Sequence, residues 1–166
     1  AYGDFLANIA EHFRGEGFNF EVISPLNEPQ YDWSGGTQSG TQATNGEISA
    51  LIKEINAAFA AAETQAMIMI PESGNHQYAH SPIGGSADDQ IYEFWNTSSD
   101  NYIGDLSHLS GAFAIHSYWS NSSMQDIYDN RVATRTALQD ENRSAKDVQF
   151  WQTEYSVLGA DYLSAL

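Results

Sequence analysis

The stretch AMIMIPE, residues 66–72, decides the fold. Five apolar residues follow one another without a polar interruption, and the run stops at Pro71-Glu72. A strand with one face in water alternates apolar and polar side chains, whereas a strand buried on both faces is apolar throughout. This stretch therefore predicts a buried strand of a parallel sheet that ends near Pro71.

Further strand patterns lie on both sides of this stretch, and helical patterns separate them. The predicted strands are FNFEVIS at 18–24, AMIMI at 66–70, AFAIH at 112–116 and VQFWQ at 148–152. The first predicted helix begins at a cap by Asp4 and ends at Gly15 and Gly17, and the second begins at a capping box of Thr44 and Glu47. The others are a loose helix from Ile91 towards Leu109, a helix over 122–142 and a truncated helix after Glu154. Strands that alternate with helices indicate parallel pairing, so the predicted fold class is α/β.

Ionisable side chains follow the predicted strands at nearly regular intervals. Glu28, Glu72, His116 and Glu154 each lie at or just after the carboxyl end of a strand. A (β/α)₈ barrel collects its active-site groups at these ends, and a doubly wound sheet also places its ligand there. The pattern predicts that the four side chains share one site.

Composition excludes several classes of function. The formal net charge is −16, and a field of that sign repels the phosphates of nucleic acids. The chain contains no cysteine, so disulfides and thiolate metal sites are excluded, and no apolar run is long enough to span a bilayer. We expect no nucleic-acid partner, no membrane insertion and no metal or organic cofactor.

Two of these carboxylates are sufficient for one well-defined reaction. Hydrolysis of a glycosidic bond needs a carboxylic acid that protonates the leaving oxygen and a carboxylate that acts on the anomeric carbon. When the pair lies about 5 to 6 Å apart, the second group acts as a nucleophile and the configuration is retained. Composition alone does not select the pair, because the chain contains 22 acidic residues.

The sequences around Glu28 and Glu154 single out these two residues as the candidate catalytic pair. SPLNEPQYDW at 24–33, together with QTEY at 152–155, resembles the (β/α)₈ glycosidases that carry Asn-Glu-Pro after strand four and Glu after strand seven. With IPESG at 70–74 and HSYW at 116–119 between them, the chain is similar to glycoside hydrolase family 30, and most similar to its endo-β-1,6-galactanase-like branch. Where that branch leads us to expect Gln-Glu-Gly, the chain has Gln38-Ser39-Gly40.

The resemblance implies roles for particular residues. Glu28 matches the catalytic acid/base, Glu154 the nucleophile of a double displacement, and Asn27 the amide that binds the sugar 2-hydroxyl. The other implied substrate-binding residues are Trp33, Glu72, His116, Tyr118 and Trp119. For Glu72, His116 and Tyr118 a supporting hydrogen-bonded core is an equal alternative, and for Trp33 and Trp119 the alternative is packing.

The resemblance also implies an incomplete barrel. Residues 1–166 match the central portion of a (β/α)₈ catalytic domain, about strands four to seven, so remaining segments of the same barrel are the expected partner. The expected activity is hydrolysis of a β-linked galactan by a secreted or periplasmic enzyme. The alternatives are a xylanase or β-glycosidase of the same family, and a non-catalytic carbohydrate-binding or inert barrel fragment.

Overall fold

The chain forms a parallel sheet with helices between its strands. The structure, a computed structural model, describes residues 1–36, 38, 40–118, 123–141 and 147–155. The elements in order are α1 (Tyr2–Gly15), β1 (Val22–Ile23), α2 (Asn45–Ala62), β2 (Met67–Ser73), α3 (His76–His80), α4 (Gln90–Trp95), β3 (Leu109–His116), α5 (Met124–Glu141) and β4 (Gln149–Glu154). The strands pair in the order β1-β2-β3-β4, and every pair is parallel. The α/β class with a parallel sheet is confirmed, whereas a closed barrel stays a prediction.

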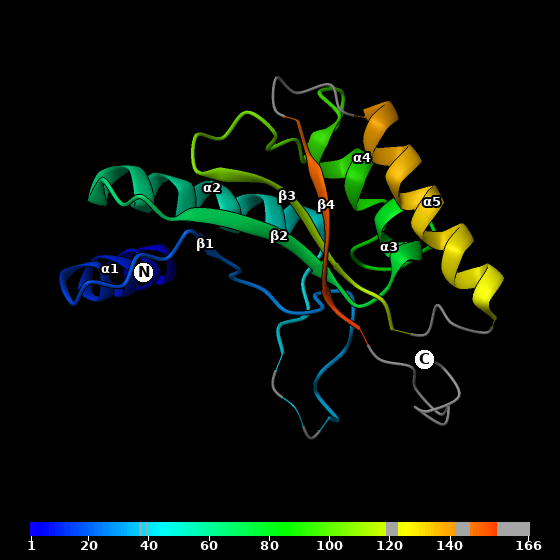
Figure 1. The fold of residues 1–166 in the computed structure, drawn as a ribbon, viewed down its shortest axis with the longest axis horizontal. Helices are drawn as coiled ribbons and strands as arrows, with labels where there is room; N and C mark the ends of the chain where they lie inside the picture. The colour runs from blue at the N-terminus through cyan, green and yellow to red at the C-terminus, as the bar shows by residue number, and fades with distance from the viewer. Residues whose placement is uncertain (37, 39, 119–122, 142–146, 156–166) are drawn as a thin grey trace.

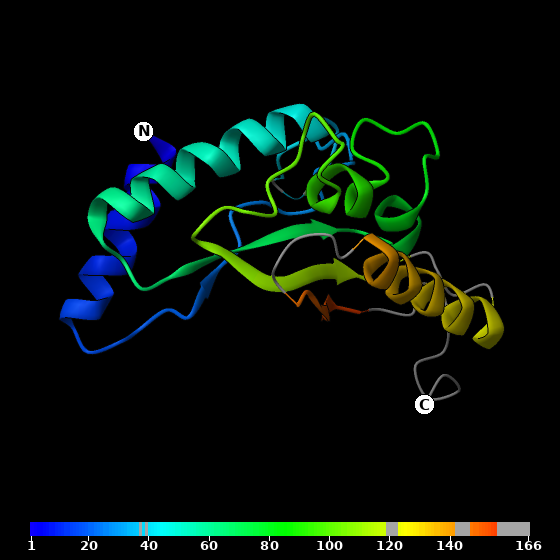
Figure 2. The ribbon, with the colours of Figure 1, turned by 90° about the horizontal axis from the view of Figure 1, so that it is seen from above.

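One face of the sheet is covered by helices. In Figures 1 and 2, α2, α3, α4 and α5 lie on the same side of the strands, and α1 lies beside α2. Ile68 and Ile70 of β2 and Phe113 of β3 point into this layer and are fully buried. Because alternate residues of a strand face the same side, the apolar residues at these positions anchor the sheet to its helices.

The other face of the sheet carries smaller side chains. Met69 of β2 and Ala112 and Ala114 of β3 form a second, separate cluster, against which Val22 packs. Continuing the alternation from Ala112 through Ala114 brings His116 to this face at the carboxyl end of β3. His116 is therefore on the face that the helices leave uncovered.

The helix α2 begins where the sequence predicts. The Thr44 hydroxyl accepts a hydrogen bond from the Glu47 backbone N–H at 3.2 Å, and the Thr44 backbone N–H donates to the Glu47 carboxylate at 2.8 Å. This reciprocal pair is a capping box, which satisfies donors that the first turn leaves unpaired. Ile48, Ile52 and Phe59 then face the core, as their spacing indicates. No helix among the described residues is long and apolar enough to cross a membrane.

The predicted strand at 18–24 is shorter than expected. Only Val22 and Ile23 pair with β2. The backbone N–H of Phe18 instead donates to the carbonyl of Phe13 at the end of α1, and the ring of Phe20 packs edge-on against Phe13. These residues terminate α1 instead of extending the strand, because the carbonyl groups of the last helical turn have no donors within the helix.

Two helix predictions were wrong. Asp4 does not cap α1, because the helix begins at Tyr2 and Asp4 lies in its first turn, where it binds the N-terminal ammonium at 3.3 Å. The loose helix from Ile91 towards Leu109 ends at Trp95. Beyond it, the side chains of Asn96 and Ser99 accept hydrogen bonds from nearby backbone N–H groups, so they form turns in competition with a helix. The predicted helix after Glu154 lies outside the described residues.

Candidate active site

The carboxyl ends of the four strands bring the predicted ionisable residues together. Glu72, His116 and Glu154 end or nearly end β2, β3 and β4, and the sheet register pairs His116 with Glu154. Glu28 follows β1 at the end of a short loop, where its backbone N–H donates to the Glu72 carbonyl at 2.9 Å. Parallel pairing explains the meeting, since it places all carboxyl ends on one edge of the sheet.

His116 lies at the centre of this cluster. Its Nδ1 is 2.8 Å from Glu28 Oε1, and its Nε2 is 3.2 Å from Glu72 Oε2. The same Nδ1 is 3.5 Å from Glu154 Oε2. The imidazole is 1% exposed, and Glu28 and Glu72 are nearly as buried, at 5% and 6%. One buried ring therefore links three carboxylates from three different segments of the chain.

The charge of His116 follows from these partners. Burial alone would lower its pKa, but hydrogen bonds to Glu28 and Glu72 and the charge of Glu154 outweigh burial and raise the pKa to about 9. Burial also opposes ionisation of Glu72, yet hydrogen bonds from His116 and Thr153 lower the pKa of Glu72. At neutral pH, a buried imidazolium therefore compensates the negative charge of the cluster.

Glu154 differs from the other two glutamates in being accessible. Its side chain is 48% exposed, and its Oε2 accepts a hydrogen bond from the Tyr118 hydroxyl at 2.9 Å. Burial and this hydrogen bond raise the pKa of Tyr118 to about 12, so the phenol keeps its proton and stays a donor. Tyr118 thus fixes one oxygen of Glu154 while the carboxylate remains open to an incoming molecule.

Glu28 and Glu154 approach each other closely enough to act on one bond. One carboxylate oxygen of each, together with a nitrogen of His116, all lie within 4.8 Å of one another. Glu28 and Glu72 both adopt positive φ angles, 43° and 56°, which are unfavourable for glutamate and are typically retained where function requires a particular side-chain position.

The chain resembles known proteins over most of its length. Residues 1–164 match the model of "O-Glycosyl hydrolase family 30". The chain belongs to O-glycosyl hydrolase family 30. It is also similar to a solved structure, "Crystal structure of conserved exported protein from Bacteroides fragilis", with 28% identity and a TM-score of 0.87. That match covers 96% of this chain and 32% of the Bacteroides chain. No curated protein matches the chain.

Two further candidate residues of this family 30 chain, Asn27 and Trp33, lie on the loop after β1. Asn27 is half-buried and lines a cavity of about 330 Å³ together with 24–26 and 40–41. Trp33 lines a cavity of about 530 Å³, and its indole Nε1–H donates to the backbone carbonyl of Glu28 at 3.2 Å. Trp119 lies outside the described residues.

Two positions at the site carried no prediction. The hydroxyl of Thr153 donates to Glu72 Oε2, so the residue before Glu154 also holds the neighbouring carboxylate. Gly74 lies beneath the loop of Glu28, and a Cβ there would meet the side chains of Gln30 and Tyr31 at 2.6 Å and Glu28 Oε1 at 3.0 Å. Thr153 directly precedes Glu154, and Gly74 lies two residues after Glu72, so the sequence signal for both is their place in the strings QTEY and IPESG.

The cluster also has the donor atoms of a cation site, since Glu28, His116 and Glu154 offer one ligand atom each within a small volume. A metal ion needs the lone pair of a neutral imidazole. With its pKa raised to about 9, His116 carries a proton on both nitrogens at neutral pH and occupies the position of a cation itself. A metal ion at this position would have to displace that proton.

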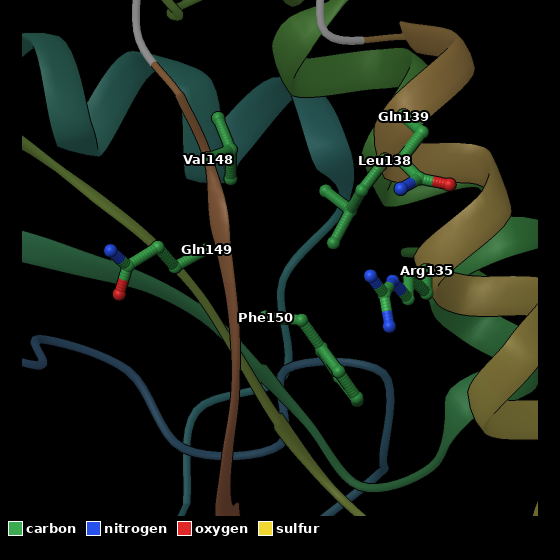
Figure 3. A pocket seen from close by; sticks show the side chains of 6 residues that line it. All are labelled: Arg135, Leu138, Gln139, Val148, Gln149 and Phe150. Carbon is green, nitrogen blue, oxygen red and sulfur yellow. The ribbon is translucent and has the colours of Figure 1, made fainter.

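A cavity on the helix-covered face is chemically different. It measures about 390 Å³ and lies between α5 and β4. Arg135 and Leu138 of α5 project towards Phe150 of β4, whereas the side chain of Gln149 points to the opposite side of the strand (Figure 3). None of these side chains is a carboxylate or a nucleophile. The clustered carboxylates of this family 30 chain are instead at the carboxyl edge of the sheet.

Proposed function

We propose that this chain carries the catalytic centre of a retaining glycoside hydrolase, with Glu28 as acid/base and Glu154 as nucleophile. Membership of family 30 supports glycoside hydrolase activity. The observation that carries the mechanism is the close approach of the two glutamates, since one carboxylate oxygen of each lies within 4.8 Å of the other. A short separation favours direct attack by one carboxylate on the anomeric carbon, because the alternative, attack by an activated water, needs a wider gap between the two carboxyl groups.

The surroundings of each glutamate fit its role. Glu154 is exposed and held by Tyr118, so its free oxygen can attack the anomeric carbon and form a glycosyl ester. Glu28, as the acid, gives its proton to the leaving oxygen and later takes a proton from the attacking water. His116 contacts both groups and supplies positive charge beside the carboxylate that each step leaves negative.

The proposed substrate is a β-linked galactan, cleaved within the chain. The support is the string SPLNEPQYDW at 24–33, which resembles the endo-β-1,6-galactanase-like branch. A xylan or another β-glycoside is the alternative within the family. The field of the net charge, −16, favours a neutral glycan over an anionic one.

We also propose that the catalytic domain is a (β/α)₈ barrel to which this chain contributes strands four to seven. The support is the parallel order of the strands and the 32% share of the Bacteroides structure that the chain covers. The second candidate, a non-catalytic or inert fragment, is favoured by the same small share. Export is proposed because that structure is described as an exported protein.

The test uses three variants of the complete protein and an aryl β-galactoside with a good leaving group. Glu154→Gln removes the nucleophile and should abolish turnover of every substrate. Glu28→Ala should still form the glycosyl ester from the activated substrate, and added azide should accelerate its breakdown about tenfold or more. Glu16→Gln, in the exposed turn after α1, makes the same charge change as Glu154→Gln and should behave as wild type.

Two outcomes would decide against this proposal. Turnover by Glu154→Gln would show that another group is the nucleophile. An inactive Glu28→Ala protein that azide does not rescue, while Glu16→Gln is fully active, would remove Glu28 from the role of acid/base. Wild-type protein without activity on β-galactosides but active on β-xylosides would correct the substrate and leave the mechanism in place.

A further inference from the structure

Arg131 of α5 is bonded to the carboxyl ends of two strands. Its Nε–H donates to Gln152 Oε1 of β4 at 3.0 Å, and its Nη2–H donates to the hydroxyl of Ser117, directly after β3, at 3.2 Å. The guanidinium carbon also lies 5.6 Å from the centre of the Tyr155 ring. A further hydrogen bond, from Nη1 to the Ile127 carbonyl at 3.0 Å, holds the side chain on its own helix. One guanidinium therefore connects α5 to the ends of β3 and β4.

These contacts lie on both sides of an irregularity in β4. Ile115 of β3 pairs with Gln152, but the next residue, His116, pairs with Glu154, so β4 contains one extra residue at this point. A β-bulge of this kind bends its strand and changes the direction of the side chains beside it. Glu154 directly follows the extra residue. Arg131 thus contacts the chain before and after the bulge that directs Glu154.

The bulge lies at an edge of the sheet. Within the described part of the chain β4 pairs with β3 alone, and residues 151–155 are exposed. The backbone N–H of Ser117 donates to the Glu154 carbonyl at 3.0 Å, and the hydroxyl of Tyr118, the next residue, donates to the Glu154 carboxylate at 2.9 Å. Because Arg131 holds Ser117 as well as β4, it acts on the segment that makes both of these bonds.

We propose that Arg131 is a positioning residue, which holds the bulge of β4 so that the Glu154 carboxylate faces the reacting bond. This inference rests on the proposed function, in which Glu154 is the nucleophile. Arginine suits the role better than lysine, because a planar guanidinium donates to several acceptors in fixed directions, whereas an ammonium is a point charge. A reacting group displaced by about 1 Å can lose about 10²-fold in rate. Loss of these contacts should therefore slow attack by Glu154 more than it weakens binding of the sugar.

Inactivation by a fluorinated sugar measures this attack directly in the complete protein. The probes are dinitrophenyl 2-deoxy-2-fluoro-β-galactoside and the corresponding β-xyloside. An oxygen of Glu154 bonds to the anomeric carbon, and dinitrophenolate leaves as an anion with the electron pair of the broken bond, so no proton from Glu28 is needed. The ester accumulates and is located by mass spectrometry. The dependence of the rate on probe concentration separates the binding constant from the rate constant of inactivation.

Four variants and wild type are compared. Arg131→Met, which has no donor, should lower the rate constant of inactivation about 10²-fold and leave the binding constant within about twofold. Arg131→Lys keeps the charge and should still lose about tenfold. Arg135→Met, at an exposed position one turn further along α5, is the matched control and should react as wild type. Gln152→Ala removes one acceptor of Arg131 and should lose about tenfold.

The outcomes separate this inference from the proposed function. Wild-type protein that neither probe labels at Glu154 overturns both. Labelled wild type combined with a wild-type rate constant in folded Arg131→Met or in Arg131→Lys overturns the inference alone, as does an equal loss in Arg135→Met. If Arg131→Met shows no cooperative thermal melt, the decision passes to Gln152→Ala, with Gln149→Ala, exposed on the same strand, as its control. Equal rate constants in these two variants would then overturn the inference.

Discussion

The helix-covered layer and the buried centre of the polar cluster, formed by His116, Glu28 and Glu72, are equally inaccessible but are stabilised in different ways. Ile70 and Phe113 are fully buried among other apolar groups, and His116, at 1% exposure, is as inaccessible as they are. Apolar packing tolerates replacement by another apolar side chain of similar volume. In the polar cluster each atom needs its own partner, because an unpaired buried charge costs several kcal/mol. Burial alone therefore does not distinguish a core from an active site; pairing does.

The largest expected effect comes from removing the shared partner of the cluster. His116→Gln leaves Glu28, Glu72 and Glu154 without a compensating positive charge. We expect kcat to fall about 10²-fold or more, and its pH profile to lose the alkaline limb near 9. His12→Gln, on the exposed face of α1, is the control and should leave both unchanged. An unaltered pH profile in His116→Gln would mean that the ring does not act on the glutamates.

The matching change in the apolar layer should affect stability alone. Phe113→Ala removes a fully buried ring that packs on Trp95 and should lower the free energy of unfolding by about 3 to 5 kcal/mol. Phe18→Ala, at a 67% exposed ring, should change it by less than about 0.5 kcal/mol. Denaturant unfolding measures both. A shifted pH profile in the fraction of Phe113→Ala that remains folded would show that the two regions are coupled.

The two buried histidines should give the two regions opposite responses to pH. His116, with its pKa raised to about 9, stabilises the fold below its ordinary value of 6.5, and this contribution is lost as pH rises through 9. His76, in the helix layer between Thr134 and Phe150, has its pKa lowered to about 4 by burial and by the charge of Arg131. Its contribution is present above 6.5 and is lost as pH falls through 4.

Stability measured from pH 4 to 10 should therefore be highest near pH 6 to 7. His116→Gln should flatten the alkaline side, and His76→Gln should flatten the acidic side, where Glu72 leaves a residual slope because its pKa is lowered. Each variant serves as the control for the other. Equal changes on both sides in either variant would contradict the separation of the two regions.

A single methyl group should produce the smallest effect. Gly74→Ala places a Cβ against Gln30, Tyr31 and the Glu28 carboxylate, so the loop that carries Glu28 has to shift. Displacement by a few tenths of an ångström should reduce kcat about tenfold with little change in the melting temperature. Gly35→Ala has open space around its Cβ and should be silent. Wild-type kcat in Gly74→Ala would indicate that the position of Glu28 is less critical than proposed.

The sequence by itself determined the class of fold and most members of the cluster. Apolar runs such as 66–70 and the capping box at Thr44 depend on neighbouring residues only, so local patterns suffice to predict them. Glu28, Glu72, His116 and Glu154 could be found because each follows such a run. The ends of the strand at 18–24 and of the helix after Ile91 could not, because packing on Phe13 and turns at Asn96 and Ser99 set them.

Only the tertiary structure decided how the cluster works. That His116 lies between Glu28 and Glu72, that Thr153 holds Glu72, and that Tyr118 holds Glu154 all depend on contacts between residues from 36 to 88 positions apart. No local pattern encodes such distances, because the sheet register and the twist of the strands set them together. The charge of His116 arises in the same way, since an imidazole acquires a pKa of about 9 only where folding surrounds it with carboxylates.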